Sequence, residues 1–161
     1  EDTDIGCLIS EEAAIEVERQ VNETVAAGAK IVIGGKRNGA FYEPTIIDNI
    51  TKDMDVAKDM EIFGPVISVI GFDTIEEAIE IANQSKYGLS AGIITNDMSK
   101  AIKVSEKVES GGFVINGASF FRSFEQPFGG WKYSGIGNEG IMTTLREMSR
   151  TKTVILKNIT K

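Results

Sequence analysis

Two short segments of this chain hold side chains that could take part in chemistry. In the first, residues 61–65, the carboxylate of Glu61 and the phenyl ring of Phe63 stand beside a Gly-Pro pair that bends the chain. A carboxylate here could accept hydrogen bonds from vicinal hydroxyls, as acids do with ribose. The residue types alone favour a simpler interpretation, in which Glu61 is solvated and Phe63 belongs to the core at the start of a strand.

The second segment, residues 117–126, places Arg122 between Phe121 and Phe124 in a stretch with no obvious regular structure. The guanidinium could hold a carboxylate or another polar substrate end through two hydrogen bonds. An exposed arginine that stacks on a neighbouring ring explains the pattern equally well. The two interpretations of Arg122 therefore stand level.

The most glycine-rich part of the chain, residues 127–140, surrounds the aromatic side chains of Phe128 and Trp131. Glycine at this density indicates close backbone approaches, and an irregular loop that carries two aromatics indicates a shaped site. Its last residues, 135–140, fit the dinucleotide pattern G-x-G-x-x-G. No hydrophobic strand precedes them, however, and Thr160 stands where the pattern requires an acid. We therefore assign no phosphate site to this segment.

Nucleophilic and metal chemistry has few candidates, because Cys7 is the only cysteine and the chain has no histidine. No base is available to activate the thiol, so we interpret Cys7 as an inert small side chain. The composition also excludes an internal disulfide, a Cys/His zinc site and a Ser-His pair within these residues. We expect no catalytic residue and no metal site in the chain.

The apolar pattern predicts the helices and strands that must position these segments. One helix begins at Ser10, which can cap it, and stops at Gly28. A second opens with a capping-box pattern at Asp73 and Glu76. Further helices are predicted over residues 99–108 and 140–150, and strands over residues 31–33, 41–50, 66–70, 91–95 and 112–116. The first and third strands are apolar enough to be buried, and the alternation indicates an α/β fold with a largely parallel sheet and flanking helices.

One more β-prone segment, between Thr153 and Lys157, arrives after the main sheet is complete. An apolar strand at a terminus commonly pairs with an edge of another sheet, which makes it a candidate for subunit contacts. It could equally join the sheet of its own domain. Both interpretations have the same weight.

Composition limits the partners of the protein. With 161 residues, 42% of them hydrophobic and 25% charged, the chain has the size of one globular domain. A net charge of -7 with dispersed lysines and arginines disfavours nucleic-acid binding. No apolar run approaches the ~20 residues of a membrane span, and no signal peptide opens the chain. We therefore expect a cytoplasmic protein that binds neither nucleic acid nor membrane.

Short motifs in a fixed order run through nearly the whole chain. They are Asp4-Ile-Gly6, Gly34-Gly35, Tyr42-Glu-Pro-Thr45, Glu61-Ile-Phe-Gly-Pro65, Tyr87-Gly-Leu-Ser90, Ile115-Asn116, Pro127-Phe-Gly-Gly130 and Ser134-Gly-Ile-Gly137. Together they resemble the C-terminal part of the NAD(P)-dependent aldehyde dehydrogenase superfamily. The spacing from Asn116 to Pro127, with an arginine between them, is most similar to the branch that includes lactaldehyde and semialdehyde dehydrogenases.

The resemblance implies a role for each of the two segments. Glu61 would hydrogen-bond the nicotinamide ribose of NAD or NADP, and Phe63 would pack near the nicotinamide, which reverses the simpler interpretation of that segment. Phe128 would line the tunnel for a small-molecule aldehyde. Arg122 and Phe121 would belong to the loop that sets substrate preference.

The resemblance also implies a division of the chain. Residues 1–147 would be part of the catalytic domain, and residues 148–161 would be an oligomerisation segment whose strand, from Thr153 to Lys157, pairs across subunits of a homo-oligomer. Cys7 stands where the family usually has proline and would not be the nucleophile. The resemblance places the nucleophilic cysteine, the general base and the Rossmann domain upstream of this chain. We therefore expect a fragment of an enzyme that oxidises an aldehyde to a carboxylic acid, inactive in isolation.

Two alternatives remain open. The chain could be a truncated interaction module that keeps the fold without catalysis. Its parent enzyme could also release the acyl group to coenzyme A rather than to water. The residues present do not separate these possibilities from the hydrolytic enzyme.

Overall fold

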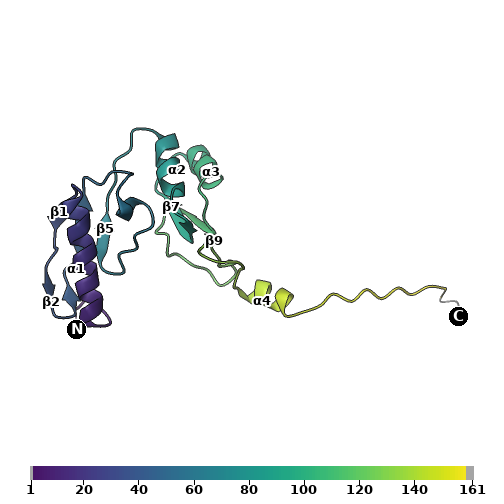
Figure 1. Cartoon of the computed structure of the whole chain (residues 1–161). Coiled ribbons are helices and arrows are strands. Elements are labelled where there is room, and N and C mark those ends of the chain that lie inside the picture. Colours follow the sequence, from purple (N-terminus) through teal and green to yellow (C-terminus); the bar gives the residue numbers. More distant parts are fainter. Residues whose placement is uncertain (1, 159–161) are drawn as a thin grey trace. The chain divides into compact units, whose positions relative to one another are not determined.

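A computed structural model describes residues 2–158 and divides the chain into two compact units (Figure 1). Unit 1 is Glu1–Lys86 and unit 2 is Tyr87–Lys161. Each unit contains helices and strands, so the expected α/β class is confirmed. Among the described residues, no helix has the length and hydropathy required to cross a membrane.

Unit 1 is built on the helix α1 (Glu11–Ala26), which begins and ends where the sequence predicts. The hydroxyl of Ser10 accepts a hydrogen bond from the backbone N–H of Ala13 at 3.1 Å and so caps the first turn. Gly28 follows the helix with a φ of 118°, a conformation that disfavours other residues. One face of the helix, with Val17 and Val21, is buried.

A three-stranded sheet accompanies α1 in the order β1 (Lys30–Ile33), β4 (Thr45–Asp48) and β5 (Val66–Ser68). The β1–β4 pair is antiparallel, and the β4–β5 pair is parallel. Between β1 and β4 the chain forms a small hairpin from β2 (Arg37–Asn38) and β3 (Phe41–Tyr42). The core joins helix, hairpin and central strand through Val17, Val21, Ala29, Tyr42, Ile47 and Ile50.

The expected burial of the strands at 31–33 and 66–70 is wrong for this chain. All four residues of β1 are exposed, and Ile67 in β5 is 63% exposed. Both are edge strands, and the core packs over the central strand β4, where Thr45 and Ile47 are buried. Continuous apolar sequence therefore does not mean that a strand is buried within unit 1, because both edge strands expose apolar side chains.

The second half of unit 1 contains the 3-10 helix η1 (Asp55–Ala57) and the helix α2 (Ile75–Asn83). The cap of α2 lies one residue later than predicted. Thr74 accepts from the N–H of Glu77 at 3.2 Å, and the Glu77 carboxylate accepts from the N–H of Asp73 at 2.8 Å. Adjacent Asp and Thr can both cap a helix. The residue at which the helix begins therefore depends on which glutamate side chain bonds back to the backbone N–H groups before the first turn.

Unit 2 contains a strand–helix–strand crossover. The parallel strands β7 (Ser90–Ile93) and β8 (Gly112–Ile115) are joined by the helix α3 (Met98–Ser105). Asp97 caps the helix by accepting from the N–H of Lys100 at 2.9 Å. The side chains predicted to face inward, Ala101, Val104 and Val108, are all buried. This part of the sequence prediction is confirmed.

The glycine-rich segment, residues 127–140, folds back on itself, and its strand β9 (Trp131–Lys132) pairs antiparallel with β6 (Tyr87–Gly88). Phe128 and Glu139 exchange backbone hydrogen bonds of 2.8 and 2.6 Å across the fold. A Cβ at Gly111 would overlap the carbonyl oxygen of Gly129, so the two backbones touch directly. The density of glycine reflects this close approach.

The chain ends with the short helix α4 (Ile141–Glu147) and an extended tail. Residues 151–158 form no strand within this chain, so the segment from Thr153 to Lys157 does not join the sheet of its own unit, and its pairing across subunits stays a prediction. The apolar side chain of Ile155 is 81% exposed there. The rest of the predicted oligomerisation segment, residues 159–161, lies outside the described residues.

Candidate functional site

Residues 61–65 form a tightly turned loop that leads into β5. The N–H of Gly64 donates to the carbonyl of Ile62 at 2.8 Å, and the N–H of Val66 donates to the carbonyl of Gly64 at 2.8 Å. Ile62 packs against the core of unit 1, whereas its neighbours Glu61 and Phe63 are exposed. The loop therefore anchors itself through one side chain and presents the two on either side of it.

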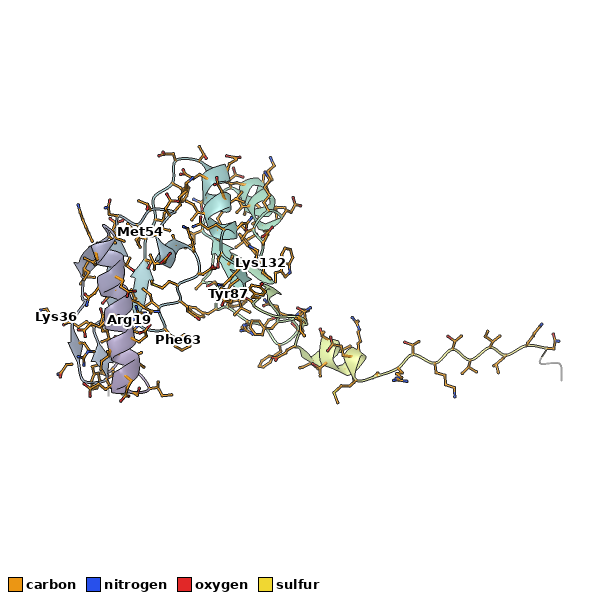
Figure 2. All side chains as sticks on the ribbon, viewed as in Figure 1. Arg19, Lys36, Met54, Phe63, Tyr87 and Lys132 are labelled. Atoms are coloured by element: carbon orange, nitrogen blue, oxygen red, sulfur yellow. The ribbon has the colours of Figure 1, made fainter. Side chains whose placement is uncertain are left out.

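The exposed side of this loop lines an open cavity of about 650 Å³. Phe63, labelled in Figure 2, is 80% exposed, so its assignment to the core on residue type alone is wrong for this chain. The Glu61 carboxylate, the uncovered ring of Phe63 and the exposed Cys7 all line it. The lining residues are Ile5, Gly6, Cys7, Leu8, Glu61, Ile62, Phe63, Gly64 and Pro65.

The segment just before the cavity is tied to the chain that follows α2. The Asp59 carboxylate accepts from the backbone N–H of Lys86 at 3.0 Å and from the hydroxyl of Ser85 at 3.2 Å. The Lys86 ammonium lies 3.4 Å from the same carboxylate. These contacts, the backbone hydrogen bond first, lower the pKa of Asp59.

In unit 2 the structure brings Arg122 and Phe128 together. The guanidinium carbon of Arg122 lies 3.1 Å from the centroid of the Phe128 ring, a cation–π contact. Phe128 is half-buried, and the neighbouring Phe121 and Phe124 are exposed. The stacking interpretation of Arg122 is therefore realised. A stacked guanidinium still presents its N–H edges, so a hydrogen-bonding role is compatible with this contact.

The predicted site residues thus form two groups. Glu61 and Phe63 belong to unit 1, and Phe121, Arg122 and Phe128 belong to unit 2. No group of acidic residues and cysteine suited to a metal ion occurs within residues 2–158. The G-x-G-x-x-G pattern lies in irregular chain between the two-residue β9 and the seven-residue α4, which agrees with its rejection as a phosphate site.

Sequence reasoning missed Gln20, which contacts the first group. Its side-chain Nε2 donates to the backbone carbonyl oxygen of Glu61 at 3.2 Å. The two residues are 41 positions apart, and a glutamine within a helix carries no signal of such a contact in its residue type. It also missed the edge-to-face pair of Tyr87 and Tyr133, whose ring centroids are 6.5 Å apart.

Comparison with known proteins gives a consistent result. The family model described as "Aldehyde dehydrogenase family" matches residues 1–154. A lactaldehyde dehydrogenase of Methanococcus maripaludis strain C7 is 47% identical over 157 residues, which are 98% of this chain and 33% of that protein.

Two solved structures are also similar. Aldehyde dehydrogenase 21 of Physcomitrella patens, in complex with the reaction product succinate, matches with a TM-score of 0.91 and 40% identity over 98% of this chain and 33% of its own. The glyceraldehyde-3-phosphate dehydrogenase of Methanocaldococcus jannaschii, complexed with NADP, matches with a TM-score of 0.89 and 45% identity. The match covers 96% of this chain and 33% of that protein. This chain therefore spans about a third of the length of the relatives that it matches.

Proposed function

This chain belongs to the aldehyde dehydrogenase family, and from that premise we propose that it forms the C-terminal part of an NAD(P)-dependent enzyme that oxidises an aldehyde to a carboxylic acid. The observation that carries the proposal is the open cavity walled by Glu61 and Phe63. Both side chains are exposed on a loop whose middle residue, Ile62, is held by the core. Such a loop presents a carboxylate and a ring at fixed positions.

The cavity fits part of a nicotinamide dinucleotide. Its volume of about 650 Å³ lies within the usual ~300–1,000 Å³ range of small-molecule sites. An exposed carboxylate matches the vicinal hydroxyls of a ribose, and an exposed ring offers an apolar surface to a flat heterocycle. When bound, the nicotinamide supplies the acceptor for a hydride.

Within this site, Glu61 and Phe63 act by orientation. The Glu61 carboxylate accepts hydrogen bonds from the hydroxyls of the ribose. These bonds limit rotation of the nicotinamide ring that is attached to this ribose. Phe63 covers one side of that ring and keeps water away from it. Neither residue exchanges a proton with the substrate in this proposal.

The aromatic loop of unit 2 contacts the aldehyde. Phe128 provides an apolar wall for its carbon chain, and Arg122 stacked on that wall binds a carboxylate or hydroxyl at the far end. Phe121, exposed in the same loop, adds apolar contact area. The succinate complex of the similar plant enzyme supports a substrate with an anionic end.

The attacking atom comes from elsewhere in the polypeptide. Cys7 has no histidine near it because the chain contains none, so these residues offer no activated nucleophile. The complete enzyme is therefore active in this proposal, and the 161-residue chain alone is not.

The test is turnover of the complete enzyme that contains this chain. It should reduce NAD+ or NADP+ with lactaldehyde or succinate semialdehyde, and the isolated chain should not. A parallel assay with coenzyme A separates hydrolytic from acyl-transferring release. Absence of reduction with every aldehyde and both cofactors, in a folded enzyme, would contradict the proposal.

Replacement of Glu61 tests the cavity itself. Glu61→Ala should slow hydride transfer by about 10- to 100-fold, since a misplaced reacting group commonly costs that much. Glu61→Gln, which keeps one acceptor oxygen, should lose less. Glu43→Gln removes another exposed carboxylate of unit 1 and serves as the control. Equal rates for Glu61→Ala and the unaltered enzyme in single-turnover measurements would remove Glu61 from the cofactor site.

A further inference from the structure

One face of α1 contacts three places in the segment that ends in the cavity wall. Val17 touches Gly64, where an added Cβ would lie 2.7 Å from the Val17 Cγ2. Gln20, three residues later, donates from Nε2 to the Glu61 carbonyl at 3.2 Å. Residues three and four apart share a helix face, so these contacts follow one line along α1.

The third contact completes the series. The hydroxyl of Thr24, four residues after Gln20, lies 3.9 Å from the sulfur of Met60. The helix therefore meets residues 64, 61 and 60 in turn, and the segment runs along α1 in the opposite direction. The two outer contacts are van der Waals or weak sulfur contacts, whereas the middle one is a directed hydrogen bond to the residue that carries the carboxylate.

We propose that Gln20 is a positioning residue for Glu61. A carbonyl held by a helix side chain fixes the orientation of the peptide that follows it, and so the direction in which the Glu61 side chain leaves the backbone. Gly64 against Val17 holds the far end of the loop, and Gln20 prevents rotation at the near end. The proposal rests on the proposed cofactor role of Glu61.

The test uses Gln20→Met in the complete enzyme. Methionine has a similar length and good helix propensity but cannot donate a hydrogen bond. Asn22→Leu removes an amide from an exposed position of the same helix and is the matched control. We expect Gln20→Met to speed backbone hydrogen exchange in residues 61–64 and to weaken binding of NAD(P)H. Each effect should be about two- to tenfold, as for the loss of one hydrogen bond.

A double-mutant cycle separates positioning from general stability. If Gln20 acts through the Glu61 carboxylate, Gln20→Met should not weaken NAD(P)H binding further when Glu61 is already alanine. An additive loss, or unchanged exchange and binding in Gln20→Met, would overturn the positioning role. If Glu61→Ala itself leaves cofactor binding and hydride transfer unchanged, the proposed function fails instead, so the two failures are distinguishable.

Discussion

At the scale of single residues, the contact of Arg122 with Phe128 bears on the substrate preference that we propose for the complete enzyme. A guanidinium stacked on a ring is held in a plane without losing its N–H edges, whereas a lysine ammonium has no such plane. The stacked arginine can therefore meet the carboxylate of a substrate in a fixed geometry. Stacking on a ring and binding of a polar substrate end, the two interpretations of Arg122 that the sequence favours equally, are therefore compatible.

We predict that Arg122→Met lowers kcat/KM for succinate semialdehyde by about 10- to 100-fold, since a charge-assisted, bidentate bond is lost. Activity with propanal, which has no polar end, should change little. Arg122→Lys should restore only part of the preference. Steady-state kinetics with both aldehydes give kcat/KM for each variant. Glu125→Gln in the same loop is the control. An equal loss with both aldehydes would mean that Arg122 supports the loop rather than the substrate.

The role of Glu61 shows where residue-level prediction stops. Its residue type and neighbours favour a solvated side chain, and only the resemblance to a family gives it a partner. The structure adds that Phe63 is uncovered and that Ile62 anchors the loop between them. Gln20 could not be found from the sequence, because a contact across 41 residues depends on the tertiary fold.

At the scale of elements, prediction works where the determining interactions are local. The cap at Ser10 and the inward face of α3 involve residues within four positions of each other, and both are correct. Burial of β1 and β5 and pairing of the tail depend on what lies beside them, which no local pattern contains. The structure does not bear out the expected burial of β1 and β5, and pairing of the tail across subunits stays a prediction.

The link between η1 and the end of α2 gives a pH prediction. The folded-state pKa of Asp59 is lowered from its usual 3.8, mainly by the backbone N–H of Lys86. A lowered folded pKa contributes stability that is present above the unfolded pKa and lost as pH falls through the folded one. Asp59→Asn should therefore destabilise the chain at pH 7 and have less effect below about pH 3.

Urea unfolding followed by circular dichroism at both pH values measures this difference. Asp53→Asn changes an exposed acid in the same stretch of chain and is the control. The assignment to Asp59 would be refuted if the destabilisation by Asp59→Asn were the same at pH 3 and pH 7.

At the scale of the whole molecule, each of the two units holds one group of the proposed site residues. Glu61 and Phe63, which we propose for the cofactor, lie before the division at Lys86, and Arg122 and Phe128, which we propose for the substrate, lie after it. The tail adds a third feature, an apolar segment without a strand partner among the described residues. We propose that another subunit supplies that partner.

This proposal predicts the effect of one proline. Ile155→Pro removes a backbone N–H and disfavours strand pairing, so it should reduce the oligomer of the complete enzyme to smaller species. Ile155→Val keeps β-propensity and should leave assembly intact. Light scattering after size-exclusion chromatography measures the mass. An unchanged mass for Ile155→Pro would assign the subunit contacts to another surface.

The backbone contact between Gly111 and Gly129 has a consequence for engineering the enzyme. Any side chain at Gly111 meets the carbonyl of Gly129, so a mutant library that varies this position mostly samples misfolded proteins. Residues 118–125, by contrast, are all exposed. If this loop contacts the substrate as we propose, randomising these residues while keeping both glycines should diversify the accepted aldehydes at little cost in folded protein.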